Sequence, residues 1–136
     1  MIKLDFAKAF DSVNWASLLK ILEARGLPAK WCDWMRQLLV TSKSAVLLNG
    51  ALGPRISCKR GLRQGDALSP YLFLLVADVL QTMIKADTMI KHPLTSGTAP
   101  VLHYADDIII LLRADMESVQ RLKIALDSFF PPALGW

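Results

Sequence analysis

Residues 101–112 read Val-Leu-His-Tyr-Ala-Asp-Asp-Ile-Ile-Ile-Leu-Leu, and they carry the clearest indication of how the chain folds. Two apolar runs, Val101–Tyr104 and Ile108–Leu112, flank the triplet Ala105-Asp106-Asp107. Apolar runs of this length on either side of a short polar connection are typical of two antiparallel strands joined by a tight turn. The sequence therefore predicts a β-hairpin with two carboxylates at its turn.

A third acidic residue lies in an apolar run near the start of the chain. Asp5 stands between Leu4 and Phe6 in Ile2–Phe6, a run with the length of a strand. A buried carboxylate without a partner costs several kcal/mol, and a divalent cation such as Mg²⁺ removes that cost. Acids at neighbouring strand ends can hold two metal ions about 4 Å apart for phosphoryl transfer. For each acid alone, an Asx turn or a surface salt bridge is the structural alternative.

Two amphipathic helices are predicted after the first strand, because apolar residues recur there at helical spacing. Gly26 and Pro28 end the first of them. We expect the tryptophans on these faces to lie in the core rather than to stack on nucleic-acid bases. The first face consists of Trp15, Leu18, Leu19 and Leu22, and the second of Trp31, Trp34, Met35, Leu38 and Leu39.

The middle of the chain predicts a second hairpin and a long helix. Ala45–Leu48 and Arg55–Lys59 read as two strands joined through Asn49-Gly50. Ser69-Pro70 reads as the start of a helix that runs to about Ala86. This helix is apolar nearly all round, so we expect it to be buried.

A turn-rich connection, His92–Pro100, leads into the hairpin of residues 101–112, and a final helix follows. Asp115 is its predicted N-cap, and Pro131-Pro132 ends it. The order of strands and helices along the chain predicts an α+β domain with a largely antiparallel sheet. The inward face of the final helix is expected to be Val119, Leu122, Leu126 and Phe129.

Composition excludes several classes of protein. The 136 residues have the length of about one domain, and a hydrophobic fraction of 53% excludes a disordered polymer. No apolar stretch approaches the roughly 20 residues of a membrane-spanning helix, and no signal peptide opens the chain. We therefore expect no membrane partner and an intracellular protein of nucleus or cytoplasm. Cys32 and Cys58 form no CxxC pair, so neither a disulfide framework nor a zinc site is indicated.

Charge is unevenly distributed along the chain. Lys20–Arg63 holds nine basic and two acidic residues, whereas the rest of the chain holds seven basic and ten acidic residues. Basic patches attract phosphates, and acids gathered in a cleft attract cations. An ordinary solvated surface is the alternative interpretation.

A glycine-containing basic loop, Arg60–Pro70, leads into the long helix. Gly61 and Gly65 allow close backbone approach, and a plain capped loop is the structural alternative. The loop offers a ligand one amide and two guanidinium groups, from Gln64, Arg60 and Arg63.

Three segments of the chain resemble motifs A, B and C of reverse transcriptases, in the order of that family. They are Leu4–Val13, Gly61–Pro70 and Tyr104–Asp107. The variant is most similar to non-LTR (LINE-type) retrotransposons, in which Lys-Ala-Phe-Asp and Arg-Gln-Gly-Asp are usual, and group II intron maturases share much of it. The resemblance covers about residues 2–130.

The resemblance implies a polymerase palm and an RNA-directed DNA polymerase activity. The partners would be an RNA template, a DNA primer whose 3′-hydroxyl is the nucleophile, and deoxynucleoside triphosphates. Asp5 and Asp106 would be the main ligands of two Mg²⁺ ions, with Mn²⁺ as an alternative. Asp107 would complete the acidic cluster, and the backbone carbonyl of Phe6 would help to hold one ion.

The same resemblance implies roles for residues around the incoming nucleotide. Phe10 matches the aromatic steric gate whose ring excludes a ribose 2′-hydroxyl. The other residues that it places at the nucleotide, the template or the primer end are Arg63, Gln64, Gly65, Tyr104 and Ala105.

The departures from the family pattern also bear on function. Ala67 stands where the family often has proline. The sequence contains no segments that match the fingers, the lysine-bearing motif or the thumb of the family. We interpret residues 1–130 as a partial reverse transcriptase palm and residues 131–136 as a divergent tail. We therefore expect a fragment that is inactive alone. A non-catalytic nucleic-acid-binding remnant, a maturase-like reverse transcriptase and a translated relic without function are the alternatives.

Overall fold

The structure, a computed structural model, describes residues 1–5, 9–104 and 107–129, and of Asp5 and Ala9 it describes the backbone. Helices and antiparallel strands both contribute, so the predicted α+β class is confirmed. No helix in the described ranges is long and apolar enough to cross a membrane.

The chain divides into two compact units. One comprises Met1–Ala9 and Leu74–Trp136, and the other comprises Phe10–Phe73. Helix α4 (Ser69–Ala86) begins in the second unit and continues into the first. Its two ends agree with the sequence prediction.

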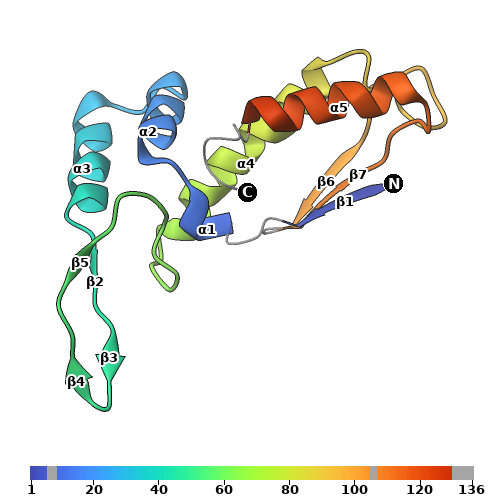
Figure 1. Cartoon of the computed structure of the whole chain (residues 1–136). Coiled ribbons are helices and arrows are strands. Elements are labelled where there is room, and N and C mark those ends of the chain that lie inside the picture. Colours follow the sequence, from blue (N-terminus) through green and yellow to red (C-terminus); the bar gives the residue numbers. More distant parts are fainter. Residues whose placement is uncertain (6–8, 105–106, 130–136) are drawn as a thin grey trace. The chain divides into compact units, whose positions relative to one another are not determined.

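A three-stranded antiparallel sheet forms one layer of the first unit (Figure 1). Strands β1 (Ile2–Asp5), β7 (Asp107–Ile110) and β6 (Val101–Tyr104) lie in the order β1-β7-β6. The hairpin predicted from residues 101–112 is therefore confirmed, and the predicted first strand is its neighbour. Ala105 and Asp106, which join β6 to β7, lie outside the described residues.

Helices α4 and α5 (Met116–Phe129) lie on the same side of this sheet and bury its apolar face (Figure 1). Ile108 and Ile110 of the central strand are fully buried against Leu80 and Ile84 of α4 and against Leu122 of α5. Full burial of a side chain of this size contributes about 1.5–3 kcal/mol. The core thus holds β7 in place, and β7 begins with Asp107.

The N-terminus of α5 is capped as predicted, and its buried face includes Leu122 and two more of the four predicted residues. Asp115 Oδ1 accepts a hydrogen bond from the Ser118 backbone N–H at 2.8 Å. The prediction was wrong for Val119, which is 42% exposed, because Ser118 turns inward at that point of the helix. Leu126 and Phe129 do pack against the core.

Ser118 holds α5 to the loop that follows α4. Its side chain is fully buried, its Oγ donates to Met89 O at 3.2 Å, and it accepts from Lys91 N at 3.4 Å. Ser118→Ala is expected to lower the free energy of unfolding by about 1–3 kcal/mol, because two partly buried backbone groups lose their partner. Urea unfolding measures this change.

Ser128→Ala is the matched control on the same helix. Ser128 is exposed and its Oγ donates only within the helix, to Ile124 O at 2.8 Å. Its replacement should change the stability by less than about 0.5 kcal/mol. Equal losses in both variants would contradict the role of Ser118.

Asp115 makes the stability of the first unit depend on pH. The hydrogen bond from the Ser118 backbone N–H holds the pKa of the Asp115 carboxyl below its usual value of 3.8, and the positive charges of Lys91 and Arg113 add to this effect. The stabilisation is therefore present above that usual value and is lost as the pH falls through the lower pKa of the folded state.

The Asp115→Asn variant tests this pH dependence, because it keeps an oxygen that can cap the helix but has no charge. We expect the wild type to be the more stable protein at neutral pH and the difference to disappear in acid. Urea midpoints measured from about pH 6 to pH 2 give both curves. A difference that stays constant to the lowest pH would contradict the prediction.

Three helices follow β1, namely α1 (Ala9–Ser12), α2 (Trp15–Ala24) and α3 (Ala29–Val40), and all their residues except Ala9 belong to the second unit. The sequence predicted α2 and α3 but not α1, whose four residues are too few for a periodic pattern. Asn14 Oδ1 caps α2 by accepting from Ser17 N at 3.0 Å. The chain leaves α2 at Gly26, whose φ of +77° is typical of a residue that ends a helix.

The expectation that the tryptophans of α3 lie in the core was wrong for Trp34, which is 54% exposed. The buried side of α3 is formed by Cys32, Met35 and Leu39. Trp34 lies on the neighbouring side, where the Lys30 ammonium stands 5.2 Å from its ring centroid. Cation–π attraction and the aliphatic stem of lysine explain how a large aromatic ring is tolerated in water.

The predicted hairpin after α3 consists of two short ladders. Strands β3 (Leu47–Leu48) and β4 (Ala51–Leu52) pair across Asn49-Gly50, whose positive φ values suit a tight hairpin turn. Strands β2 (Lys43–Ser44) and β5 (Ile56–Ser57) pair nearer the base. The predicted partner of Ala45–Leu48 was therefore wrong, because the intervening Gly53-Pro54 divides the second strand and proline has no N–H for a ladder.

Helix α4 is less buried than its composition suggested. Leu72, Phe73 and Ala77 are buried, but Tyr71 and Leu74 are exposed. The expectation of a helix buried on all sides was therefore wrong, since only one stripe of α4 is covered by the described residues.

Candidate active site

One acidic position of β1 is paired with one acidic position of the neighbouring strand β7. Asp5 lies directly opposite Asp107 in the β1–β7 register, and Tyr104 lies opposite Asp107 in the β6–β7 register. Opposed Cα atoms in antiparallel pairs are about 4.5–5.5 Å apart. The sheet therefore brings positions 5, 107 and 104 into one row at the strand ends, and the sequence predicted neighbouring strand ends for the two acidic positions.

The Asp107 carboxylate is accessible and has a positive neighbour. Lys3 Nζ lies 2.9 Å from Asp107 Oδ1, and both side chains are about half exposed (57% and 46%). Lys3 pairs with Ile109, two residues from Asp107, so alternation along β7 places both on one face. An ion pair this exposed contributes little to stability, and a cation in solution can compete for the carboxylate.

The oxygen ligands that a carboxylate such as Asp107 offers at these strand ends suit a hard metal ion. Carboxylate oxygens at a solvent-accessible strand end are the ligands that Mg²⁺ prefers. Among the described residues no group of three His, Cys, Asp or Glu side chains forms a metal site. Of the predicted ligands, Phe6 and Asp106 lie outside those residues, as does Ala105.

The second unit brings the end of motif A against the start of motif B. Gly61 N donates to Val13 O at 2.8 Å, and Leu62 N donates to Phe10 O at 2.7 Å. The Trp15 indole N–H donates to Gly61 O at 2.7 Å. Three hydrogen bonds therefore fix the backbone of Gly61–Leu62 on the segment that contains Phe10.

Gly61 is required by the close approach of these two segments. Its φ is +87°, and a Cβ built there would lie 2.8 Å from Asp11 O and 2.9 Å from Asp11 Cα. The close approach predicted for Gly61 is therefore confirmed. Gly65 has the same φ of +87° but nothing lies within 4 Å of its Cβ position, so only its conformation requires glycine.

Phe10 is held by a second aromatic residue. The rings of Phe10 and Phe73 stack with their centroids 4.9 Å apart and an interplanar angle of 22°. Phe73 belongs to the first turns of α4 and is buried. The orientation of the Phe10 ring is therefore set by the helix that follows motif B.

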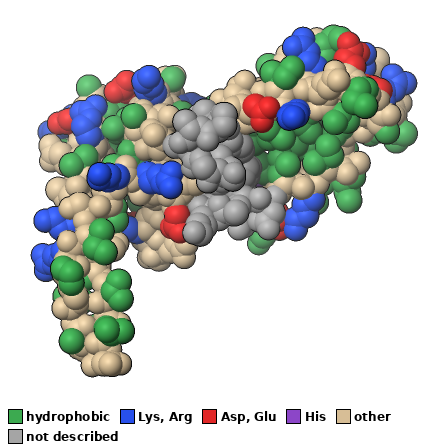
Figure 2. Space-filling model, in the orientation of Figure 1, with side chains coloured by type: hydrophobic (Ala, Val, Ile, Leu, Met, Phe, Trp, Pro, Cys, Tyr) green, Lys and Arg blue, Asp and Glu red, His purple; other side chains and the backbone are tan. Residues whose placement is uncertain are grey.

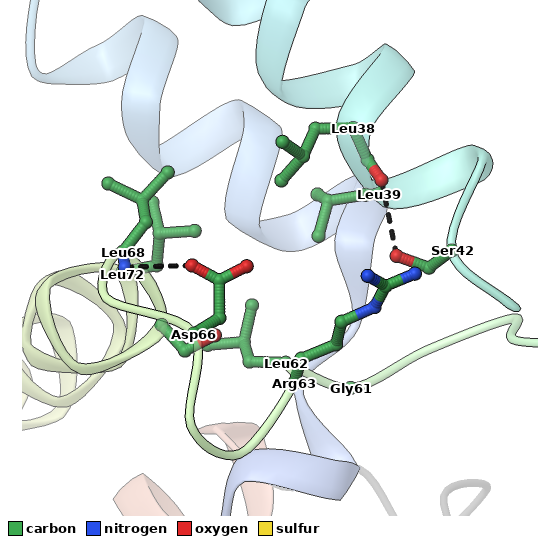
Figure 3. A pocket seen from close by; sticks show the side chains of 10 residues that line it. Leu38, Leu39, Ser42, Gly61, Leu62, Arg63, Asp66, Leu68 and Leu72 are labelled. Atoms are coloured by element: carbon green, nitrogen blue, oxygen red, sulfur yellow. Dashed lines mark hydrogen bonds between the residues drawn. The ribbon is translucent and has the colours of Figure 1, made fainter. Parts of the chain in front are cut away.

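The loop between Leu62 and α4 presents its polar side chains outward. Arg63, Gln64 and Gly65 are exposed, whereas Asp66 folds back and its Oδ1 accepts from Leu68 N at 3.0 Å (Figure 3). Leucines surround a cavity of about 50 Å³ on the inner side of the loop, with the Arg63 side chain extending toward Ser42 (Figure 3). The loop is thus anchored by Leu62 and Asp66 and leaves the predicted binding groups accessible.

The predicted site residues therefore form two groups. Asp5, Tyr104 and Asp107 belong to the first unit, and Phe10, Arg63, Gln64 and Gly65 belong to the second. Sequence reasoning missed the partners that hold these groups, namely Lys3, Trp15 and Phe73. The aromatic stack joins residues 63 positions apart, and no local pattern indicates such a contact.

Comparison with known proteins identifies the family. Residues 1–130 match the family described as reverse transcriptase (RNA-dependent DNA polymerase). The chain is 31% identical, over 82% of its length, to a Pol polyprotein of the type-1 retrotransposable element R2 from Popillia japonica. It is 31% identical, over 91% of its length, to the Pol polyprotein of the type-2 element R2DM from Drosophila melanogaster. The matched segments span 16% and 11% of these relatives. With the whole span from motif A to motif C inside the match, the chain belongs to the reverse transcriptase family, as a domain of a non-LTR element.

Proposed function

We propose that this chain carries the catalytic centre of an RNA-directed DNA polymerase, built as a polymerase palm. The single observation that carries the proposal is the strand register, which sets Asp107 opposite Asp5 on one side and opposite Tyr104 on the other. The family and its retrotransposon relatives favour this function over the maturase-like alternative. The reaction would join a deoxynucleotide to the 3′-hydroxyl of a primer on an RNA template.

Asp5, Asp106 and Asp107 would hold two Mg²⁺ ions, with the Phe6 carbonyl as a further ligand. Bound there, the metal ions would lower the pKa of the primer hydroxyl and neutralise charge on the triphosphate. Lys3 balances the charge of Asp107 when no metal is bound. The contribution of the protein is therefore to gather carboxylates on a rigid strand whose other face is buried.

Phe10 would select deoxynucleotides, with its ring held in place by Phe73. A gate excludes a 2′-hydroxyl only if its ring cannot turn aside, and the stack on a buried partner supplies that restraint. Arg63, Gln64 and Gly65 would contact the nucleotide and template, and Tyr104 and Ala105 the primer end.

The relatives are much longer than this chain, and we propose that extension needs segments beyond residues 1–136. Binding energy from those segments would position template, primer and triphosphate, and correct positioning is commonly worth several kcal/mol of barrier. We expect the purified chain to give no extension of oligo(dT) on poly(rA) with Mg²⁺ and dTTP.

A chimera tests the catalytic proposal directly. Residues 1–130 of this chain would replace the matching segment of the Popillia japonica relative, and primer extension would be measured with deoxy- and ribonucleotides. We expect extension that Asp106→Asn abolishes and Phe10→Ala opens to ribonucleotides. A folded chimera that binds template–primer but never extends it would favour the alternative of a non-catalytic remnant.

A further inference from the structure

The peptide group that joins Gly61 to Leu62 is held at both of its polar ends. Its carbonyl oxygen, Gly61 O, accepts a hydrogen bond from the Trp15 indole N–H at 2.7 Å. Its N–H, which belongs to Leu62, donates to Phe10 O at 2.7 Å. Because a peptide group is planar, the two bonds together fix its rotation. Loss of the bond from Trp15 would therefore loosen the bond to Phe10 as well.

Trp15 is mounted so that its indole N–H stays in one place. It is the first residue of α2, whose N-terminus is capped by Asn14 Oδ1, which accepts from Ser17 N at 3.0 Å. Leu18 and Leu22 of the same helix are fully buried and hold it against the rest of the unit. A donor on an anchored helix is positioned more precisely than one on a loop.

Phe10 is restrained at two different points. Phe73 stacks on its ring, with the centroids 4.9 Å apart, and the Leu62 N–H holds its backbone carbonyl. The stack acts on the side chain, whereas the hydrogen bond acts on the backbone from which that side chain projects. The position of the ring depends on both restraints, and Trp15 contributes to the second one through a single peptide group.

We propose that Trp15 is a positioning residue for nucleotide selection. Its indole N–H holds the Gly61–Leu62 peptide group, and this peptide group keeps the backbone of Phe10 where the ring meets a ribose 2′-hydroxyl. The proposal rests on the proposed function, which makes Phe10 the gate. Groups that act through their position must be held within about 0.5 Å, so a small movement of the Phe10 backbone is enough to weaken selection.

Trp15→Phe tests this role, because it keeps an aromatic ring and removes the N–H donor. In the chimera, kcat/KM for primer extension on poly(rA) would be measured with dUTP and with UTP, which differ only at the 2′-hydroxyl. We expect the ratio of the dUTP value to the UTP value to fall about fivefold, the size of one lost hydrogen bond. A purely structural loss would lower both values equally and leave the ratio unchanged.

Trp15→His is the rescue variant. Histidine Nε2 has the same place in its five-membered ring as tryptophan Nε1, so this variant can return a donor to Gly61 O without the larger ring. We expect its ratio to lie closer to the wild-type value than that of Trp15→Phe. A ratio at or below that of Trp15→Phe would overturn the assignment of the role to the indole N–H.

Matched controls come from exposed positions of the same unit. Trp34→Phe makes the same chemical change on α3, where the ring of Trp34 is 54% exposed. Leu48→Ala shortens an exposed side chain of the hairpin of residues 43–57, on which Figure 2 shows hydrophobic side chains in contact with solvent. Both should leave the ratio within about twofold of wild type. A fall equal to that of Trp15→Phe in either control would contradict a local role.

Amide hydrogen exchange of the purified chain gives a readout without catalysis. In Trp15→Phe the Leu62 amide should exchange about fivefold faster, because the peptide group has lost one of its two restraints. The Gly53 amide, which donates to Val46 O at 2.9 Å in the hairpin, is the internal reference and should not change. Unchanged protection of Leu62 would overturn the proposal whatever the chimera does.

The two proposals fail in different ways. A wild-type chimera that never extends a primer would refute the proposed function, and any role of Trp15 in selection with it. A wild-type chimera that extends and prefers dUTP, with the same preference in Trp15→Phe, would refute the role of Trp15 alone.

Discussion

Gly61→Ala is expected to lower the free energy of unfolding of the second unit by about 3 kcal/mol or more. A φ of +87° costs an L-residue about 1–2 kcal/mol. The added Cβ would also lie 2.8 Å from Asp11 O and 2.9 Å from Asp11 Cα, and these are backbone atoms. Relief of that clash would lengthen the Gly61–Val13 or Leu62–Phe10 hydrogen bond, each worth about 1 kcal/mol.

Gly65→Ala is the matched control, because Gly65 has the same φ and open space around its Cβ position. It should show only the conformational cost of about 1–2 kcal/mol. Urea unfolding followed by tryptophan fluorescence reports on this unit, which contains Trp15, Trp31 and Trp34. Equal losses in the two variants would mean that the close approach to Asp11 carries no energy.

Asp106→Asn is expected to weaken the binding of Mn²⁺, the probe ion, by about a hundredfold. Loss of groups that only support metal ligands already costs about 10–100-fold in affinity, so loss of a main ligand belongs at the upper end. In the chimera, the same substitution should lower primer extension by about a thousandfold. Asp107→Asn should weaken Mn²⁺ binding less, by about tenfold, because its proposed ligation is weaker.

Isothermal titration of the purified chain with Mn²⁺ measures these affinities without any need for extension. Asp127→Asn is the matched control, since Asp127 is an exposed carboxylate of α5 and its replacement changes the charge equally. We expect no more than a twofold change for it, as a surface charge acts only through screened long-range attraction. A loss at Asp127 equal to that at Asp106 would argue for diffuse attraction in place of a metal site.

Much of the fold follows from local chemistry in the sequence. The acidic hairpin, the Asp115 cap, the ends of α4 and the Asn49-Gly50 turn were predicted because each depends on neighbouring residues. The buried faces were predicted less well. The apolar residues of α3 form a stripe that is wider than the surface its neighbours cover. Cys32, Met35 and Leu39 are on the covered side, and Trp34 is exposed to water.

The site shows the same division between local and distant causes. The neighbouring positions of the strands that carry Asp5 and Asp107 could be predicted, since acids in two short apolar runs suit adjacent strands, but the register that sets the two residues opposite each other was not predicted. The contact between Phe10 and Phe73 could not, nor could the hydrogen bond from Trp15 to Gly61 across 46 positions. Such contacts depend on how the intervening chain closes, which periodicity does not encode.

The aromatic stack has a consequence for how the chain can change. Phe10 and Phe73 are the first and last residues of the second unit, so its two ends meet in the stack. When the two ends of a segment are held together, lengthening the loop between them costs only about 0.6 kcal/mol of closure entropy for each doubling of its length. The tip at Asn49-Gly50 can therefore grow or shrink while β1, β6 and β7 keep their register.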